Sequence, residues 1–571
     1  MKKIMLMVIA VVLCWSGVKA VPAKPIPFTH VQSDGMTVTL VMRGGEFNHS
    51  LMTLDGLTVA RALNGDYCYT AGGSLSDVRA HDEGHRGIEE TAFITAYRNQ
   101  MTLGAGASRV PRRSDENTSP QVPTLGSPRI PIILVNYEDV TFIDENPIAT
   151  FENQFNVMDY SCLHYFESQS RGRFSPQFDI LGPVDLPQTR QYYGGNVYRY
   201  GQELDQQLGT MIYDACTGLV GVDFSDYDNN GDGYVDVVVV LYAGVGEAQA
   251  WSAVPESVWP CQWDMQESFD WGCSTVGPFQ LNCVTINNYA LFNELEGYNN
   301  SSQMIDGVGT FCHEFGHCLG LPDFYPTSGG SAYGMSTWDI MDHGCYLNNG
   351  YRPCGYTSYE RHFMGWMDLI EPVENTQYTM APLVNDDGTA VKVTNDANPD
   401  EYYLLEYRIK TGWDEFLSAE GIMILHVDYD KNAWDNNTPN NNWNHPRMSI
   451  IPADNILSSS SNRYDLWPQA SDSLTNYSTP PAKVYTGGYM NKPITDMIVQ
   501  DGVASFWYMK GAAMRGDVDV DGKVNIDDVT ALINMLLSGN ITTNNADVDR
   551  DGRVNIDDVT TLIGYLLAGH W

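Results

Sequence analysis

Residues 309–323, with the sequence GTFCHEFGHCLGLPD, contain side chains suited to metal chemistry. Residues four apart lie on one face of a helix, so His313 and His317 can direct both imidazoles at one metal ion. Glu314 then lies beside that ion, and the glycine that follows lets the chain turn so that Asp323 adds an oxygen ligand. Three protein ligands and one open position are typical of catalytic zinc, which predicts a zinc site at His313, His317 and Asp323.

The chemistry expected of this site is hydrolysis. Zinc lowers the pKa of a bound water from about 15.7 toward about 7, and Glu314 is the predicted general base and acid. An additional donor to the oxyanion is expected, with His343, Tyr346 and Tyr351 as candidates. An acid farther along the chain remains an alternative to Asp323 as the third ligand. The motif therefore predicts a zinc endopeptidase that cleaves protein substrates.

Met341 lies a short way beyond the motif, in the sequence WDIMDHG. In the zinc peptidases called metzincins, a turn that contains methionine forms an apolar floor beneath the metal. Met341 resembles that methionine, and a routine buried methionine is the alternative.

A second metal-binding pattern occurs upstream, in the sequence DYDNNGDGYVD. The oxygen side chains of Asp228, Asn230, Asp232 and Asp236 match the first nine positions of a calcium loop. The twelfth position holds a valine instead of an acid, so further ligands must come from elsewhere. The alternative is a turn rich in Asp and Asn that binds no metal.

The C-terminus contains an internal repeat of about 30 residues, each copy consisting of an acidic loop followed by an apolar helix. The loops place oxygen ligands at the calcium-binding positions one, three, five, nine and twelve. The predicted ligands are Asp517, Asp519, Asp521, Asn525 and Asp528 in the first loop, and Asp547, Asp549, Asp551, Asn555 and Asp558 in the second. Two calcium ions are therefore expected.

Composition restricts the class of protein. The chain has 571 residues, which suggests several domains, and a formal net charge of −39, which argues against nucleic acid as a partner.

Lys2 and Lys3 precede an apolar run from Ile4 to Trp15, and a signal peptide cleaved after Ala20 is predicted. No later segment is apolar enough to predict a transmembrane span. A secreted protein is expected.

The chain divides into six predicted parts. Residues 1–20 form the signal peptide, residues 21–103 a β-rich pro-segment that blocks the site until release, and residues 104–128 a Pro-rich linker. Basic residues in this linker offer a place for activating cleavage. The catalytic domain is expected over residues 129–370 and a second β-rich domain over residues 371–511, followed by residues 512–571 with the repeat.

The expected fold class is multidomain, with an α/β catalytic domain built on a mixed sheet. Residues 130–135 and 235–241 read as buried strands, and residues 401–408 and 422–428 read as strands of the second β-rich domain. The repeat predicts a small helical module with EF-hand-like loops.

Two family resemblances follow from these motifs. Residues 129–510 resemble secreted metallopeptidases of the immune inhibitor A family, through HEFGHCLGLPDFY, WDIMDHG, DYDNNGDGYVD, EYYLLEYR and GIMILHVDY. This resemblance implies zinc-dependent peptide hydrolysis, a pro-segment and bound calcium. The last 55 or so residues resemble a dockerin, which implies binding to a cohesin domain of a polysaccharide-associated scaffold protein and, through that scaffold, attachment to a cell surface.

Two other classes of function remain open from the sequence. One is a non-proteolytic, cohesin-bound adhesion or scaffold protein with a vestigial zinc site. The other is a carbohydrate-active enzyme, which would need a pair of carboxylates at a defined separation.

Overall fold

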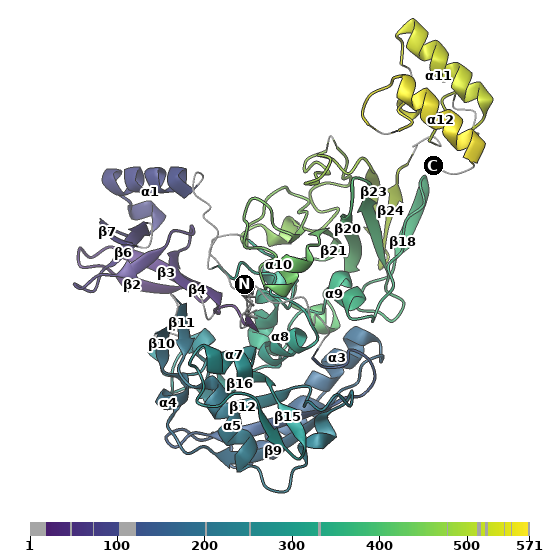
Figure 1. Ribbon diagram of the computed structural model, residues 1–571. Helices are drawn as coiled ribbons and strands as arrows, with labels where there is room; N and C mark the ends of the chain where they lie inside the picture. Colours follow the sequence, from purple (N-terminus) through teal and green to yellow (C-terminus); the bar gives the residue numbers. More distant parts are fainter. Residues whose placement is uncertain are drawn as a thin grey trace, which may run out of the picture.

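Figure 1 shows the computed structural model of the protein. It describes residues 19–45, 48–71, 74–101, 121–199, 202–250, 253–328, 333–476, 478–510, 515–519, 524–541, 543–549 and 551–568. The predicted signal peptide up to residue 18 and most of the predicted linker, residues 102–120, lie outside the described residues.

The N-terminal module contains two three-stranded antiparallel sheets and one helix. Its elements are β2 (Phe28–Val31), β3 (Thr37–Gly45), β4 (Asn48–Thr53), β5 (Val59–Arg61), β6 (Tyr67–Ala71), β7 (Ser74–Arg79) and α1 (Ile88–Met101). Alternating side chains of β3, such as Val38 and Leu40, are fully buried and join a small core of their own. The module is therefore β-rich, as expected, with a helix in addition.

The catalytic region is built on a mixed sheet with the strand order β1-β13-β16-β12-β8-β9, and β17 pairs with β16. Strands β8, β9, β12 and β16 run parallel, whereas β13 and β1 are antiparallel at one edge. The strands are β1 (Lys19–Ala20), β8 (Arg129–Asn136), β9 (Gln177–Asp185), β12 (Val238–Val245), β13 (Cys261–Asp264), β16 (Asn288–Glu296) and β17 (Met304–Ile305). Every residue of β12 is buried, as expected for a strand covered on both faces.

Helices and short hairpins surround this sheet (Figure 1). They are α2 (Pro147–Glu152), α3 (Cys162–Ser170), α4 (Arg190–Gly194), β10 (Asn196–Arg199), β11 (Gln202–Asp205), α5 (Leu208–Gly218), α6 (Glu247–Ala250), α7 (Met265–Asp270), β14 (Phe279–Leu281), β15 (Val284–Ile286), α8 (Gly309–Cys318) and α9 (Ser358–Phe363). The central helix is α8, which carries the HExxH motif and lies against β1, β13 and β16.

The β-rich region after the catalytic domain shares a core with it. This region contains β18 (Thr376–Met380), β19 (Ala390–Asn395), β20 (Asn398–Arg408), β21 (Gly421–Asp428), α10 (Lys431–Asp435), β22 (Met448–Ile450), β23 (Ile494–Gln500) and β24 (Val503–Tyr508). Side chains such as Trp413 and Leu425 lie in one apolar cluster with Phe311 and Phe315 of α8. Buried Arg408 adds polar contacts, since Nη2 donates to the Gly355 carbonyl across this interface.

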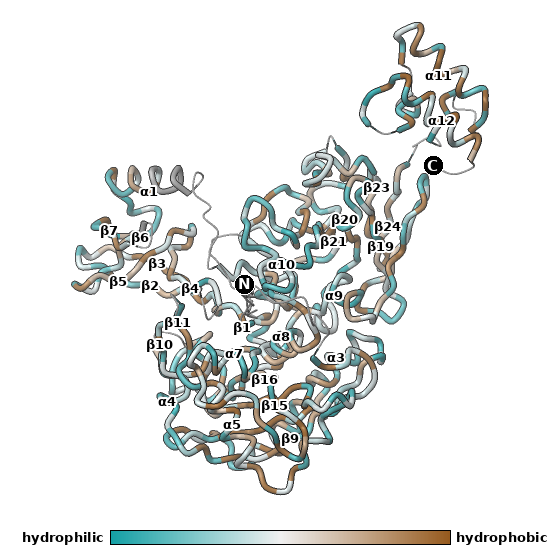
Figure 2. Tube along the Cα trace, in the orientation of Figure 1, coloured by the Kyte–Doolittle hydropathy of each residue, from teal (hydrophilic) through white to brown (hydrophobic). Residues whose placement is uncertain are grey.

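The C-terminal repeat forms two helices, α11 (Ile526–Ser538) and α12 (Ile556–Ala568), which pack through a separate small core. In Figure 2, hydrophobic residues recur along both helices and along the strands near β9. Within the part of the chain that the structure describes, none of the helices has the length and apolar character needed to cross a bilayer.

Residues next to two predicted boundaries contact the catalytic region in the structure. Residues 121–128, assigned to the linker, pack on the catalytic region: Val122 is fully buried and its N–H donates to the Cys318 carbonyl. Lys19 and Ala20, assigned to the signal peptide, pair as β1 with Gln262 and Cys261 of β13. Local composition did not reveal either contact, because both depend on partners far away in the sequence.

Candidate metal centre and catalytic cleft

The HExxH helix is held by apolar packing on one side and ends at a glycine. All ten residues of α8 are buried, and Phe311 and Phe315 stack in the core at 5.4 Å between ring centroids. Gly320 has φ +97°, a conformation that favours glycine, and Leu321 N–H donates back to the Gly316 carbonyl. This turn carries the chain back to Asp323, as the sequence predicts.

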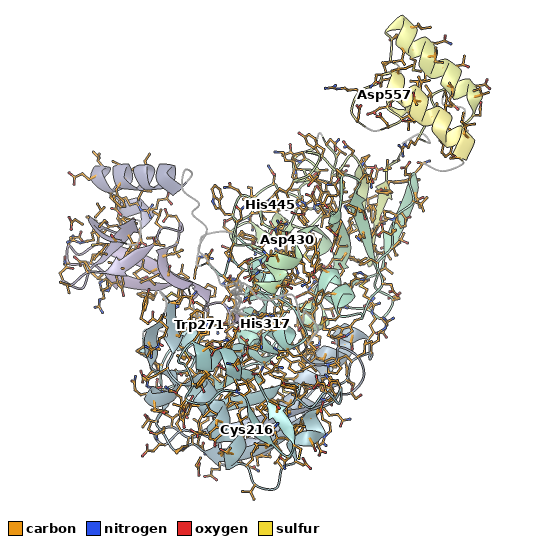
Figure 3. The ribbon with its side chains drawn as sticks, viewed as in Figure 1. Cys216, Trp271, His317, Asp430, His445 and Asp557 are labelled. Atoms are coloured by element: carbon orange, nitrogen blue, oxygen red, sulfur yellow. The ribbon has the colours of Figure 1, made fainter. Side chains whose placement is uncertain are left out.

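The three predicted zinc ligands meet at one point. Asp323 Oδ1 lies 3.1 Å from His313 Nε2 and 3.2 Å from His317 Nε2, and the two Nε2 atoms are 3.2 Å apart. Bonds of about 2.0–2.1 Å to a tetrahedral zinc would separate such ligand atoms by about 3.3 Å. The nearly equilateral triangle therefore fits a zinc ion. Figure 3 shows His317 near the centre of the molecule.

Backbone carbonyls orient both imidazoles. His313 Nδ1 lies 2.7 Å from the Ile340 carbonyl, and His317 Nδ1 lies 2.8 Å from the Leu321 carbonyl. A carbonyl can only accept, so each Nδ1 donates and each Nε2 of the neutral ring keeps its lone pair for the metal. Burial lowers the pKa of His317 to about 4, which favours this neutral form.

Asp323 is positioned by a residue from the β-rich region. Asn437 Nδ2 donates to Asp323 Oδ2 at 2.6 Å, and Asn437 Oδ1 accepts the Asp323 N–H at 2.6 Å. The other carboxylate oxygen, Oδ1, is buried and has no hydrogen-bond partner among the described residues. Both imidazole nitrogens lower the pKa of Asp323 despite its burial. An ionised oxygen facing two imidazoles is the donor set expected around a metal ion.

Met341 forms the floor of the site. Its side chain is fully buried, and a Cβ added at Gly316 would lie 2.7 Å from Met341 Sδ. The absence of a side chain at Gly316, between Glu314 and His317, thus lets the methionine approach the helix. The Met341 carbonyl also accepts the Phe324 N–H, which fixes the segment that carries Asp323. The predicted turn is therefore next to the metal centre.

A peptide unit of the same chain lies across the site. Val21 N–H donates to Glu314 Oε1 at 2.7 Å, and Tyr325 Oη donates to the Ala20 carbonyl. These are the leaving nitrogen and the carbonyl oxygen of one peptide bond, each held by a different side chain. Tyr325 was not among the sequence-based candidates, although it follows the third ligand by only two residues.

The chain continues along the cleft from this peptide bond. Trp259 Nε1 donates to the Val21 carbonyl at 3.0 Å and Tyr346 Oη donates to the Pro22 carbonyl at 2.7 Å. Lys24 N–H donates to the Ala248 carbonyl at 2.9 Å. The walls of the cleft thus come from residues on both sides of α8 in the sequence.

The predicted oxyanion donors lie elsewhere. Tyr346 contacts Pro22, one residue beyond the peptide bond at Glu314, and Tyr351 Oη donates to the Ile305 carbonyl at 2.5 Å. His343 Nδ1 is 2.5 Å from Asp342 Oδ1. Of the four side chains, Tyr325 is the one that contacts the Ala20 carbonyl.

The predicted calcium loop in the catalytic domain is closed by its own hydrogen bonds. Asp228 accepts N–H groups of residues 231–233, and Asn230 Nδ2 donates to Asp232 Oδ2 at 3.0 Å. Asp236 receives Asn229 Nδ2 at 2.8 Å, and burial raises its pKa to about 6. Among the described residues, Asp228, Asp232 and Asp236 do not converge as one potential metal-binding group. Calcium at this loop stays a prediction.

Both repeat loops bring carboxylates together. Asp517, Asp519 and Asp528 form one group and Asp547, Asp549 and Asp551 form another, with ligand atoms within 4.8 Å of one another. Burial raises the pKa of Asp547, as do the negative charges of its neighbours. Asp528 also accepts the N–H groups of Val518 and Asn525. Asp521 lies outside the described residues. Asn525 and Asn555 directly precede α11 and α12, and Asp558 lies in the first turn of α12.

Two regions of the chain match families of known proteins. The buried HExxH helix, the ligand triangle and the methionine turn define a metallopeptidase catalytic domain. Residues 134–367 match the family described as immune inhibitor A peptidase M6, catalytic domain, and residues 515–567 match the dockerin type I domain. Residues 134–367 thus carry a catalytic domain of the immune inhibitor A (M6) peptidase type, and residues 515–567 carry a dockerin type I domain.

Two relatives illustrate the extent of similarity. A pre-pro-metalloprotease PrtV of Vibrio cholerae serotype O1 is 26% identical over 250 residues, which cover 40% of this chain and 26% of that protein. Immune inhibitor A of Bacillus thuringiensis subsp. alesti is 24% identical over 294 residues, which cover 43% of this chain and 41% of that protein. The chain therefore spans well under half of the length of these relatives.

Proposed function

We propose that this protein is an exported zinc endopeptidase, made as a zymogen and attached through its dockerin to a cohesin-bearing scaffold. The observation that carries the proposal is the triangle of His313, His317 and Asp323 donor atoms, 3.1–3.2 Å apart, with Glu314 next to it on the same helix. A zinc ion held there would supply the positive charge that polarises a peptide carbonyl and an attacking water.

The side chains of the cleft supply the remaining chemistry. Glu314 removes a proton from the attacking water and returns it to the leaving nitrogen, at the position that Val21 N occupies in the structure. Tyr325 donates a hydrogen bond to the carbonyl oxygen as negative charge develops there, at the position of the Ala20 oxygen. Asn437 keeps the Asp323 carboxylate oriented throughout.

Latency follows from the same contacts. Residues 19–24 fill the cleft, and the β3–β4 hairpin closes over them, since Ala23 N–H donates to the Gly44 carbonyl at 2.6 Å. Substrate and this segment cannot occupy the cleft together. With signal cleavage after Ala20, the Val21 nitrogen becomes an ammonium group beside the Glu314 carboxylate, which strengthens that contact by charge.

Attachment to a scaffold is supported by the repeat. Each helix exposes apolar residues at equivalent positions: Ile526 and Ile556 are 65% and 66% exposed, and Leu537 and Leu567 are 82% and 84% exposed. Exposed apolar faces of this kind are typical of protein-binding surfaces. Their duplication supports a cohesin partner that binds in either of two orientations.

The proposal is tested with the full-length exported chain and its Glu314→Gln variant, each activated by limited trypsin nicking before trypsin is blocked. We expect both to contain one zinc, and only the wild type to release peptides from casein, with loss of about 10²–10⁴-fold in the variant. Removal of zinc by a chelator should stop cleavage, and added zinc should restore it. A variant that retains full proteolysis would exclude Glu314 as the base, whereas zinc without any cleavage would favour a vestigial site.

A further inference from the structure

Two contacts of the segment in the cleft depend on lysine side chains, because Lys19 Nζ donates to the Leu321 carbonyl and Lys24 forms an ion pair. The contacts of Val21 and Pro22 with the cleft walls use backbone carbonyls, which every peptide offers. Lys24, by contrast, places its ammonium group 2.6 Å from Glu296 Oε1 in an ion pair whose two side chains are only 7% and 12% exposed. This contact therefore distinguishes one sequence from another.

Three residues of the catalytic domain form the pocket around this ammonium. Glu296 ends β16, Asp306 follows β17, and Tyr346 comes from the segment after the methionine turn. Lys24 Nζ lies 5.6 Å from the centroid of the Tyr346 ring, a distance that permits a cation–π interaction. Burial raises the pKa of Asp306, and the nearby Lys24 charge acts in the opposite direction.

The pocket belongs to the enzyme and not to the pro-segment. Asp306 is held by Gln249 and Asn293, which donate to Oδ2 at 3.1 Å and 3.0 Å, and by Thr310 of α8. These contacts do not involve Lys24, so they persist when the segment leaves. Departure of the segment then leaves the Glu296 carboxylate without the Lys24 ammonium and able to pair with another cation.

We infer that the pocket of Glu296, Asp306 and Tyr346 is a substrate subsite that selects lysine or arginine at the fourth residue after the cleaved bond. Val21 supplies the nitrogen at Glu314 and therefore marks the first residue after that bond, which makes Lys24 the fourth. A substrate in the same path would place its fourth side chain against Glu296. This inference rests on the proposed proteolytic function.

The test reads the positions at which the enzyme cuts a mixture of denatured proteins. The full-length exported chain is nicked with trypsin, trypsin is then blocked, and cleavage sites are identified by mass spectrometry. The Glu314→Gln chain, treated identically, provides the background. We expect lysine and arginine to be enriched at the fourth position after the cleaved bonds, with no such enrichment at the third or fifth.

Two variants of Glu296 and one control sharpen the test. Glu296→Gln should lower kcat/KM about tenfold or more for a peptide with lysine at the fourth position and leave the matching alanine peptide unchanged. Glu296→Lys should reverse the preference toward acidic residues. Glu371→Gln, which changes an exposed acid in the β-rich region, should retain the wild-type profile.

The outcomes separate the inference from the proposed function. Cleavage without enrichment at the fourth position would overturn the subsite and leave the peptidase intact. No cleavage beyond the Glu314→Gln background would instead contradict the proposed function. If the Glu296 variants fail to fold, the wild-type chain still decides, because equal kcat/KM for lysine, alanine and glutamate peptides would refute the subsite.

Discussion

Glu314 and Tyr325 hold the two ends of one peptide unit, the Val21 nitrogen and the Ala20 carbonyl. In the tetrahedral transition state of peptide hydrolysis, negative charge develops on the carbonyl oxygen, and the leaving nitrogen must gain a proton. The two side chains are thus placed where charge changes most during hydrolysis. Glu314 and Tyr325 therefore have separate expected roles, at the nitrogen and at the carbonyl oxygen, although each lies within two residues of a predicted metal ligand in the sequence.

Replacement of Tyr325 by phenylalanine tests the oxyanion contact. We expect kcat to fall about 10²–10³-fold because one hydrogen-bond donor to the transition state is lost, with little change in KM. Zinc content should not change. Tyr351→Phe is the matched control, because its hydroxyl contacts the Ile305 carbonyl instead, and it should retain kcat. An unchanged kcat in Tyr325→Phe would contradict the assignment.

At the scale of single elements, the loop after α10 supports Asp323, the predicted third zinc ligand. Asn437, with φ +55°, holds Asp323 through two hydrogen bonds of 2.6 Å. Asn440 of the same loop donates to the Phe324 carbonyl at 2.7 Å. The β-rich region thus contributes to the metal centre by positioning the segment that carries Asp323.

Asn437→Ala should weaken zinc binding about 10–100-fold, because the Asp323 carboxylate loses the partner that orients it. Zinc affinity is measured by competition with a chelator of known affinity. Asn444→Ala provides a control in the same loop, at an exposed position. Equal zinc affinity in both variants would show that Asn437 does not position the ligand.

Asp339 of the methionine turn and Glu360 of α9 form a buried pair of acids with consequences for stability. Asp339 Oδ2 and Glu360 Oε1 are buried without a hydrogen-bond partner among the described residues, and burial together with their mutual interaction raises the pKa of both carboxyl groups. The folded protein therefore keeps a proton that the unfolded chain loses above about pH 4. The stability that this pair provides is complete below that pH and decreases as the pH rises.

Asp339→Asn should reduce this pH dependence, because an amide cannot ionise and can still accept the Met341 N–H. We expect the free energy of unfolding of the variant, relative to the wild type, to increase between about pH 4 and pH 8. Chemical denaturation at several pH values measures this difference. A difference that is constant or decreases with pH would argue against a shared proton.

The sequence predicted which residues of the site converge when they are close together in the chain, and it missed the residues that reach the site from distant segments. His313, Glu314, His317 and Asp323 are related by helix spacing and one turn, which sequence spacing encodes directly. Tyr325, Asn437 and Lys24 act through contacts with residues 305, 114 and 272 positions away. No local pattern predicts such contacts, because they depend on how whole elements pack.

The fold was predictable to a similar degree. The mixed sheet and the strands at 130–135, 401–408 and 422–428 follow from apolar runs and agree with β8, β20 and β21. The strand expected at 235–241 begins later, at Val238, since Val235 pairs with Thr285 outside the named strands. The common core of the catalytic and β-rich regions was not predictable from composition, which only indicated a change of character near residue 371.

At the scale of the whole molecule, we propose three functions for three separate parts. The cleft hydrolyses peptide bonds, the segment that fills it keeps the enzyme latent, and the C-terminal repeat binds a scaffold. The acidic groups of the repeat should make its fold depend on calcium. We expect amide protons of α11 and α12 to be protected from hydrogen exchange in calcium and to exchange much faster after its removal. Equal protection in both conditions would contradict calcium-dependent folding of the repeat.

The most direct measurement is casein cleavage by the full-length exported chain, together with its zinc content, before and after limited trypsin nicking. The account predicts one zinc per chain, little cleavage before nicking and a large increase afterwards that a zinc chelator abolishes. Absence of bound zinc would contradict the site formed by His313, His317 and Asp323. Equal activity before and after nicking would instead contradict the role of the segment that begins at Val21 in keeping the cleft closed.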